Sequence, residues 1–147
     1  MPLRCLVDTN VLLRLANPSM EQHPICKQAV ARLHATGWQL YYTLQNAAEF
    51  WNVSTRPVER NGHGLTALET MLGWREVEEI LTLLPDDARV YANWRKLVVS
   101  CEVRGVQVHD AKLAATMLAH DVSRILTFNT ADFVRFPGIE AIDPSAI

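Results

Sequence analysis

The first strand-like segment of the sequence is followed at once by an acidic residue. Residues 5–7, Cys-Leu-Val, form a short apolar run that is typical of a strand buried on both faces of a parallel sheet. Asp8 follows this run directly, and a helical apolar pattern over 11–16 begins after Asn10. A carboxylate in this place lies at the carboxyl edge of a sheet, where open α/β folds bind ligands. Asp8 is therefore a candidate for chemistry, and capping the helix is its ordinary alternative role.

Strand-like and helix-like segments alternate along the chain of 147 residues. Apolar runs predict further strands over 39–42, 82–84, 124–127 and 139–142, and a brief extended piece over 106–108. Apolar periodicity predicts helices over 11–16, 24–36, 44–53, 66–80, 111–119 and from Asp86 or Asp87 to Cys101. This alternation is typical of parallel βαβ units, with helices that cover both faces of the sheet. The length suits one domain, which we expect to span residues 1–147.

Further acidic residues follow the other predicted strands. Glu49 lies two turns into the helix after the second strand, and Asp110 opens the helix after the extended piece. Asn129 and Asp132 follow the next strand. Right-handed crossovers bring the carboxyl ends of parallel strands to one edge of the sheet. We therefore expect Asp8, Glu49 and Asp110 to converge in one cleft.

Converging carboxylates repel one another, and each disfavours the ionised form of its neighbours. A cation removes this conflict, and oxygen ligands suit a hard ion such as Mg²⁺ or Mn²⁺. Such an ion activates water and binds a phosphate oxygen, and two ions about 3.5–4 Å apart would hold both the attacking and the leaving oxygen. The chemistry implied is phosphodiester hydrolysis. The ordinary alternatives are helix caps for Asp8 and Asp110 and a solvated helical side chain for Glu49.

The charge and cysteine content limit the other classes of function. The formal net charge is −2, so any nucleic-acid site must be a local basic patch. The three cysteines are widely spaced without a C-x-x-C pair, which argues against a disulfide framework or a zinc site. No apolar run approaches the roughly 18 residues needed to span a bilayer, and glycine-rich nucleotide loops are absent. We expect a cytoplasmic protein without a membrane partner.

The helical patterns also separate an apolar side from a polar side. The apolar side of the helix over 44–53 consists of Leu44, Ala47, Ala48 and Trp51. Its polar stripe consists of Gln45, Glu49 and Asn52. The apolar side of the helix over 66–80 consists of Leu68, Leu72, Val77, Ile80 and Leu81.

Four segments resemble the motifs of PIN-domain ribonucleases, in the order that this family has. Leu6–Asn10 resembles the opening in which a hydrophobic strand ends in Asp-Thr-Asn, and Asn46–Phe50 resembles the helical segment that carries a Glu. His109–Ala115 resembles the family's Asp-Ala segment, and Ile125–Phe133 resembles its closing Thr-x-Asn-x-x-Asp-Phe segment. Each motif is short, but together they cover nearly the whole chain. The likeness is greatest to VapC-type toxins of bacterial toxin–antitoxin pairs.

The resemblance implies a three-layer α/β/α sandwich with a central, mainly parallel sheet. It also implies an endoribonuclease that depends on Mg²⁺ or Mn²⁺. Asp8, Glu49 and Asp110 would be the metal ligands, with a water activated between metal and phosphate. Thr9 or Asn10 would steady the site by hydrogen bonds.

The fourth acidic position departs from the fullest pattern of the family. Asn129 stands where many members carry Asp. Either Asp132 serves instead, or Asn129 binds the metal through its amide oxygen or through water. Whether the site binds one ion or two therefore stays open. An alternative hypothesis is that the chain is a catalytically weak or inactive PIN-fold module that binds nucleic acid or protein.

The family also implies partners for the chain. These are RNA, a second copy of the chain in a homodimer, and a small cognate antitoxin protein that blocks the cleft. The candidate RNA contacts are Arg56 and Arg60, which lie in the predicted loop over 54–64. Solvated loop charges are the ordinary alternative for both. His109 adjoins Asp110 and is either a substrate contact or an ordinary strand-end residue, and we favour the second interpretation.

Overall fold

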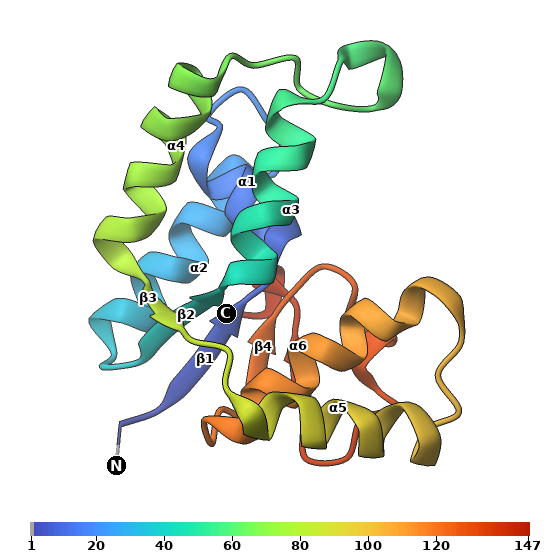
Figure 1. Cartoon of the computed structure of the whole chain (residues 1–147). Helices are drawn as coiled ribbons and strands as arrows, with labels where there is room; N and C mark the ends of the chain where they lie inside the picture. Colours follow the sequence, from blue (N-terminus) through green and yellow to red (C-terminus); the bar gives the residue numbers. More distant parts are fainter. Residues whose placement is uncertain (1) are drawn as a thin grey trace.

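The computed structural model describes residues 2–147 (Figure 1). Its strands are β1 (Arg4–Val7), β2 (Gln39–Thr43), β3 (Thr82–Leu84), β4 (Arg124–Leu126) and β5 (Glu140–Ile142). They form one sheet in the order β3-β2-β1-β4-β5, and every neighbouring pair is parallel. All carboxyl ends of the strands therefore lie at one edge of the sheet. The predicted parallel sheet is confirmed.

Helices cover both faces of this sheet. They are α1 (Thr9–Ala16), α2 (His23–Ala35), α3 (Leu44–Thr55), α4 (Ala67–Ile80), α5 (Ala88–Ser100) and α6 (Val108–Ala119). Figure 1 shows α1 to α4 gathered on one side of the strands and α5 with α6 on the other. Two separate apolar cores fill the spaces between the layers. The fold is the predicted three-layer α/β/α sandwich.

The central strand β1 contributes to both cores. Cys5 and Val7 belong to the core under α1 to α4, whereas Leu6 belongs to the core under α5 and α6. All three side chains are completely buried. Successive side chains of a strand point to opposite faces, so a strand between two helical layers has to be apolar throughout. This confirms the interpretation of the opening run.

Side-chain caps start the helices that follow β1 and β2. Asp8 is the N-cap of α1, and its carboxylate accepts a hydrogen bond from the Thr9 backbone N–H. Thr43 is the N-cap of α3 and forms a capping box with Asn46. Both caps lie at the carboxyl ends of their strands, so each helix leaves the sheet from the same edge.

The extended piece predicted over 106–108 is wrong. Gly105–Gln107 is a 3₁₀ turn, and α6 already begins at Val108. Gly105 has a φ of 57°, a left-handed conformation that Gly adopts readily, and the Val106 side chain is 81% exposed. A turn, and not the end of a strand, therefore carries Asp110 to the edge of the sheet. His109 likewise lies in the first turn of α6 and is not a strand-end residue.

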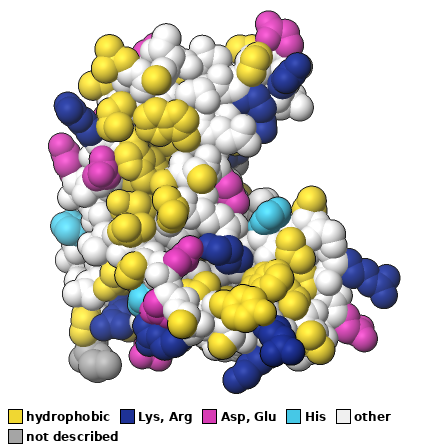
Figure 2. Space-filling view, in the orientation of Figure 1, with side chains coloured by type: hydrophobic (Ala, Val, Ile, Leu, Met, Phe, Trp, Pro, Cys, Tyr) yellow, Lys and Arg dark blue, Asp and Glu magenta, His cyan; other side chains and the backbone are white. Residues whose placement is uncertain are grey.

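Only part of the predicted apolar sides of α3 and α4 is buried. The buried residues of α3 are Asn46, Phe50 and Ser54, and those of α4 are Thr70, Trp74 and Val77. Leu44 is 63% exposed, Leu68 70% and Leu72 54%. The Thr43–Asn46 capping box places the polar side chain of Asn46 among the buried residues of α3. Figure 2 shows apolar side chains gathered on the surface beside α3 and α4.

None of the helices in residues 2–147 is long and apolar enough to cross a membrane.

Candidate active site

Asp8 combines a cap with deep burial. The residue caps α1 and is only 8% exposed. The carboxylate accepts hydrogen bonds from the Thr9 backbone N–H and from the Thr127 hydroxyl, each at 2.8 Å. The pKa of Asp8 is nevertheless raised to about 6, chiefly by burial and in smaller part by the charges of Glu49 and Asp132. Asp8 is thus a buried carboxylate with acidic neighbours.

Glu49 projects from α3 and is held by hydrogen bonds to both of its oxygens. The Thr9 hydroxyl donates to Glu49 Oε2 at 2.8 Å, and the Gln45 amide donates to Oε1 at 3.1 Å. Asn46 in turn donates to the Thr9 hydroxyl at 3.1 Å. The buried Asn46 of the α3 capping box therefore orients Thr9, and Thr9 orients Glu49.

Asn10 joins α1 to the segment after β4. Its amide oxygen accepts from the Phe128 backbone N–H at 3.2 Å. Its amide nitrogen donates to the Thr127 hydroxyl at 3.2 Å and lies 3.4 Å from Asp8 Oδ2. Arg14 supports this link from one turn further along α1. It donates to the Asn10 carbonyl oxygen at 2.6 Å and stacks over the Phe128 ring, 5.0 Å from its centroid.

Asp110 is half-buried in the first turn of α6. Unlike Asp8 and Glu49, it has a carboxylate that receives no hydrogen bond from any residue in 2–147 under ordinary distance criteria. The pKa of Asp110 is raised to about 6, chiefly by burial and then by the charges of Asp132, Asp8 and Glu49, in that order of size. Asp110 therefore faces other carboxylates with its oxygens free.

The fourth position lies on the short helix η3 (Thr130–Phe133), directly after β4. Asp132 is exposed, but its charge acts on both Asp8 and Asp110. Asn129 is also exposed, and its backbone N–H donates to the Thr127 hydroxyl at 3.0 Å. The negative charge beside Asp8 and Asp110 on this segment thus comes from Asp132.

The donor set of this cluster fits a hard divalent cation. Within residues 2–147, no three His, Cys, Asp or Glu side chains lie close enough together to hold a metal ion in this conformation. The carboxylates are nevertheless near enough to raise one another's pKa, a repulsion that a cation would remove. The ligands on offer are carboxylate oxygens, which suit Mg²⁺ or Mn²⁺.

The face beside this cluster is hollowed. Figure 2 shows the hollow between the part that contains α3 and the part that contains α5 and α6, with acidic and histidine side chains at its walls. Gln45 bridges the two parts, because its amide donates to the His109 carbonyl oxygen at 3.0 Å. Gln45, and with it Glu49, therefore lies where the two parts meet.

The two predicted basic contacts lie in different surroundings. Arg56 donates to the Asn61 carbonyl oxygen at 3.1 Å within its own loop, and its Nε is buried without a hydrogen-bond partner among the described residues. Arg60 ends the short helix η1 (Val58–Arg60) and is exposed. Arg60 is thus the side chain of the two that is free to meet a ligand.

Several residues of the site escape prediction from the sequence. Thr127 is completely buried and bonds to Asp8, Asn10 and Asn129 through one hydroxyl. Asn46 and Gln45 act on Glu49 from its own helix. The Thr-x-x-Asn spacing of a capping box was a signal for Asn46. Thr127 carried no signal of its own beyond its place in the closing motif.

The model of the PIN domain matches residues 5–139, a stretch that contains every member of the carboxylate cluster. The chain belongs to the PIN-domain family. No curated protein sequence matches it.

Solved structures of PIN-fold proteins are similar to the chain over nearly its whole length. VapBC2 from Rickettsia felis, bound to a promoter DNA fragment, has 14% identity and a TM-score of 0.71, covering 96% of this chain and 98% of that one. A toxin–antitoxin complex from Klebsiella pneumoniae has 23% identity and a TM-score of 0.61, covering 97% and 99%. VapC20 from Mycobacterium tuberculosis, a toxin that cleaves the sarcin-ricin loop, has 18% identity and a TM-score of 0.62, covering 87% and 92%. At these identities the likeness shows the fold.

Proposed function

We propose that this PIN-domain protein is a metal-dependent endoribonuclease and the toxin of a toxin–antitoxin pair. One observation carries the proposal. Asp8 and Asp110, from distant parts of the chain, both have a pKa raised to about 6 at the same edge of the sheet. Burying repelling carboxylates weakens a fold, and functional sites are where such arrangements are found.

The proposed cofactor is Mg²⁺ or Mn²⁺. When bound, such an ion supplies Lewis acidity to a phosphate oxygen and lowers the pKa of water. Asp8, Glu49 and Asp110 are the proposed ligands, and Asp132 or Asn129 completes the set. Thr9 and Asn10 keep the ligands in place through the hydrogen bonds described above. The carboxylates of the site would repel one another less with such an ion bound.

The proposed substrate is RNA. A hollow separates the part that contains α3 from the part that contains α5 and α6, and Arg60 is exposed on the loop that follows α3. A net charge of −2 leaves such local cations as the means of attracting phosphates. The naming of a similar structure as a sarcin-ricin loop cleaving toxin is consistent with a structured RNA as the target.

The proposed protein partners are a small antitoxin and a second copy of the chain. Several similar structures are toxin–antitoxin complexes. The exposed apolar side chains of α4, Leu68, Met71 and Leu72, are of the kind that a partner covers.

A binding module of PIN fold without activity is the second candidate. It is favoured by the absence, among residues 2–147, of three ligands already close enough to hold an ion. The two candidates differ in whether the ion brings about cleavage of RNA.

The test is cleavage of a pool of structured RNAs by protein freed of any bound partner. The parent and Asp110→Asn are compared with Mg²⁺, with Mn²⁺ and with chelator. We expect cuts that require the ion and are lost in Asp110→Asn, which keeps the shape of the side chain but removes its charge. Asp110-dependent ion binding without cleavage of any RNA would select the binding module instead.

A further inference from the structure

Gln45 joins two parts of the proposed site. It lies on α3 one turn before Glu49 and is half-buried. Its amide nitrogen donates to Glu49 Oε1 at 3.1 Å and to the His109 carbonyl oxygen at 3.0 Å. Both partners are acceptors only, so the amide nitrogen and not the amide oxygen must face them. One side chain thus fixes Glu49 against the first turn of α6, beside Asp110.

The other end of the same amide is unsatisfied. Gln45 Oε1 is buried and has no hydrogen-bond partner among the described residues. A buried acceptor without a donor lowers the stability of a fold, and an apolar side chain of similar size would avoid this loss. The arrangement is therefore a poor way to stabilise the protein alone. A hydrogen-bond donor that enters the site in another state of the protein would satisfy the amide oxygen.

We propose that Gln45 is a positioning residue that holds Glu49 against α6 and offers its amide oxygen to a water that enters with the ion. This inference rests on the proposed function. Mg²⁺ keeps several waters when protein carboxylates bind it, and a water is an O–H donor that a free amide oxygen accepts. Partners of metal ligands commonly orient them in this way. Gln45 thereby links the ligand on α3 to the ligand on α6.

The test replaces Gln45 with Leu, which has a similar size and no polar atoms. The probe is Mn²⁺ alone, measured by electron paramagnetic resonance and by the rise in Tm that Mn²⁺ causes. We expect the affinity of Gln45→Leu for Mn²⁺ to fall roughly 10- to 100-fold. The Tm in chelator should change little, because removal of the unpaired acceptor offsets the loss of the two hydrogen bonds that Gln45 donates. Gln28→Leu, on the exposed side of α2, is the matched control and should bind Mn²⁺ like the parent.

Unchanged Mn²⁺ affinity in a folded Gln45→Leu protein would overturn the inference, whatever its Tm. If that variant does not fold, Gln45→Asn takes its place, since it keeps the amide but is too short to reach both acceptors. It should also lose affinity, and parental affinity in Gln45→Asn would overturn the inference equally. Failure of the proposed function looks different: the parent itself would show no Mn²⁺ binding that Asp8→Asn removes.

Discussion

Asp8 and Asp87 are two helix caps of the same chemical type in opposite electrostatic surroundings. Asp8 caps α1 after β1, and Asp87 caps α5 after β3. Burial and acidic neighbours raise the pKa of Asp8 to about 6. Hydrogen bonds from Arg89 lower the pKa of Asp87 to about 2. The two aspartates therefore have the same role as helix caps but lie in electrostatically different surroundings.

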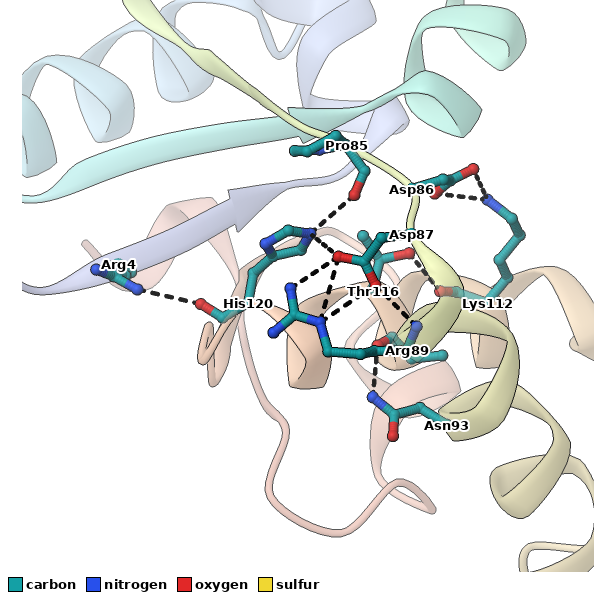
Figure 3. A network of polar contacts seen from close by, with 10 residues as sticks. Arg4, Pro85, Asp86, Asp87, Arg89, Asn93, Lys112, Thr116 and His120 are labelled. Atoms are coloured by element: carbon teal, nitrogen blue, oxygen red, sulfur yellow. Dashed lines mark hydrogen bonds and ion pairs between the residues drawn. The ribbon is translucent and has the colours of Figure 1, made fainter.

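The surroundings of Asp87 are those of an ordinary protein surface. Figure 3 shows its carboxylate facing Arg89, at 2.7 Å, and Lys112 paired with Asp86 at 3.1 Å. In the same network, His120 Nε2 forms a hydrogen bond of 2.8 Å with the Pro85 carbonyl oxygen. Each carboxylate of this network thus has its own cation. Within residues 2–147, Asp8 forms no such ion pair.

The largest expected difference concerns activity. Asn caps a helix about as well as Asp, so Asp8→Asn and Asp87→Asn both keep their helix starts. Asp8→Asn should lower the rate of metal-dependent RNA cleavage by on the order of 100-fold or more. Removing a residue that merely orients a metal ligand costs about 10- to 100-fold, and removing a ligand itself should cost at least as much. Asp87→Asn should leave the rate within about twofold, since its charge serves only a surface ion pair. Initial cleavage rates of both variants at saturating metal decide this, and equal losses would remove the distinction between the two caps.

The second prediction separates an arginine beside the cluster from one that is distant from it. Arg14 stacks over Phe128, and Arg124 stacks over Trp38, each 5.0 Å from the ring centroid. Replacement by Gln should cost the fold similarly in both, roughly 0.5–2 kcal/mol by loss of the cation–π contact. Only Arg14→Gln should slow cleavage, about 10-fold, because Arg14 also holds the Asn10 carbonyl. Chemical denaturation and cleavage rates are measured side by side, and an equal slowing by Arg124→Gln would contradict the assignment.

The third prediction concerns stability without metal, where the two caps should have opposite signs. The folded-state pKa of Asp8, about 6, lies above its ordinary value of 3.8. Its contribution to stability is therefore complete below about pH 4 and is lost as the pH rises through about 6. Asp8→Asn escapes this loss and should be more stable than the parent in chelator near pH 8. The gain is at most about 3 kcal/mol, at about 1.36 kcal/mol per pKa unit, less what its hydrogen bonds contribute.

Asp87 has the opposite linkage to pH. Its folded-state pKa of about 2 lies below the ordinary value of 3.8. Its contribution is present above about pH 4 and is lost as the pH falls through about 2, so Asp87→Asn should lower the Tm near pH 8. The decrease should be small, because the pair with Arg89 is exposed to solvent. Thermal unfolding in chelator near pH 4.5 and pH 8 measures both variants, and the same sign for both would refute the contrast.

The smallest expected effect compares two exposed arginines in the two regions. Arg60 lies on the loop after α3, and Arg89 lies in the network around Asp87. Arg60→Ala should weaken RNA binding and reduce the slope of its salt dependence by about one charge. Arg89→Ala should change neither. Binding of a structured RNA to Asp110→Asn protein at several salt concentrations gives the slopes, and equal slopes for both variants would place the RNA elsewhere.

The sequence predicts the sheet edge well, because two short-range signals coincide there. The apolar run before Asp8 is long enough for a strand, and the pattern after Asn10 is that of a helix. The carboxyl edge follows from the alternation of strands and helices. The prediction that Asp110 lies at this edge rests on an extended segment that does not exist. Val106 and Val108 resemble a strand in the sequence but lie in a turn and at the start of a helix.

The hydrogen bonds that hold the site depend on contacts between distant segments. Thr127 reaches Asp8 only because β1 pairs with β4, where the Asp8 backbone N–H donates to the Leu126 carbonyl oxygen at 2.9 Å. Nothing in the local sequence encodes that register. The buried position of Asn46 depends likewise on a distant segment, because its amide donates to the Thr9 hydroxyl at 3.1 Å.

The most direct test of the central claim is calorimetric titration of Mn²⁺ into the metal-free parent, Asp8→Asn and Asp87→Asn. The account predicts that the parent and Asp87→Asn bind Mn²⁺ with the same affinity and that Asp8→Asn does not bind it measurably. Equal binding by all three proteins, or none by the folded parent, would contradict the claim that the carboxylates around Asp8 form a site for a divalent cation.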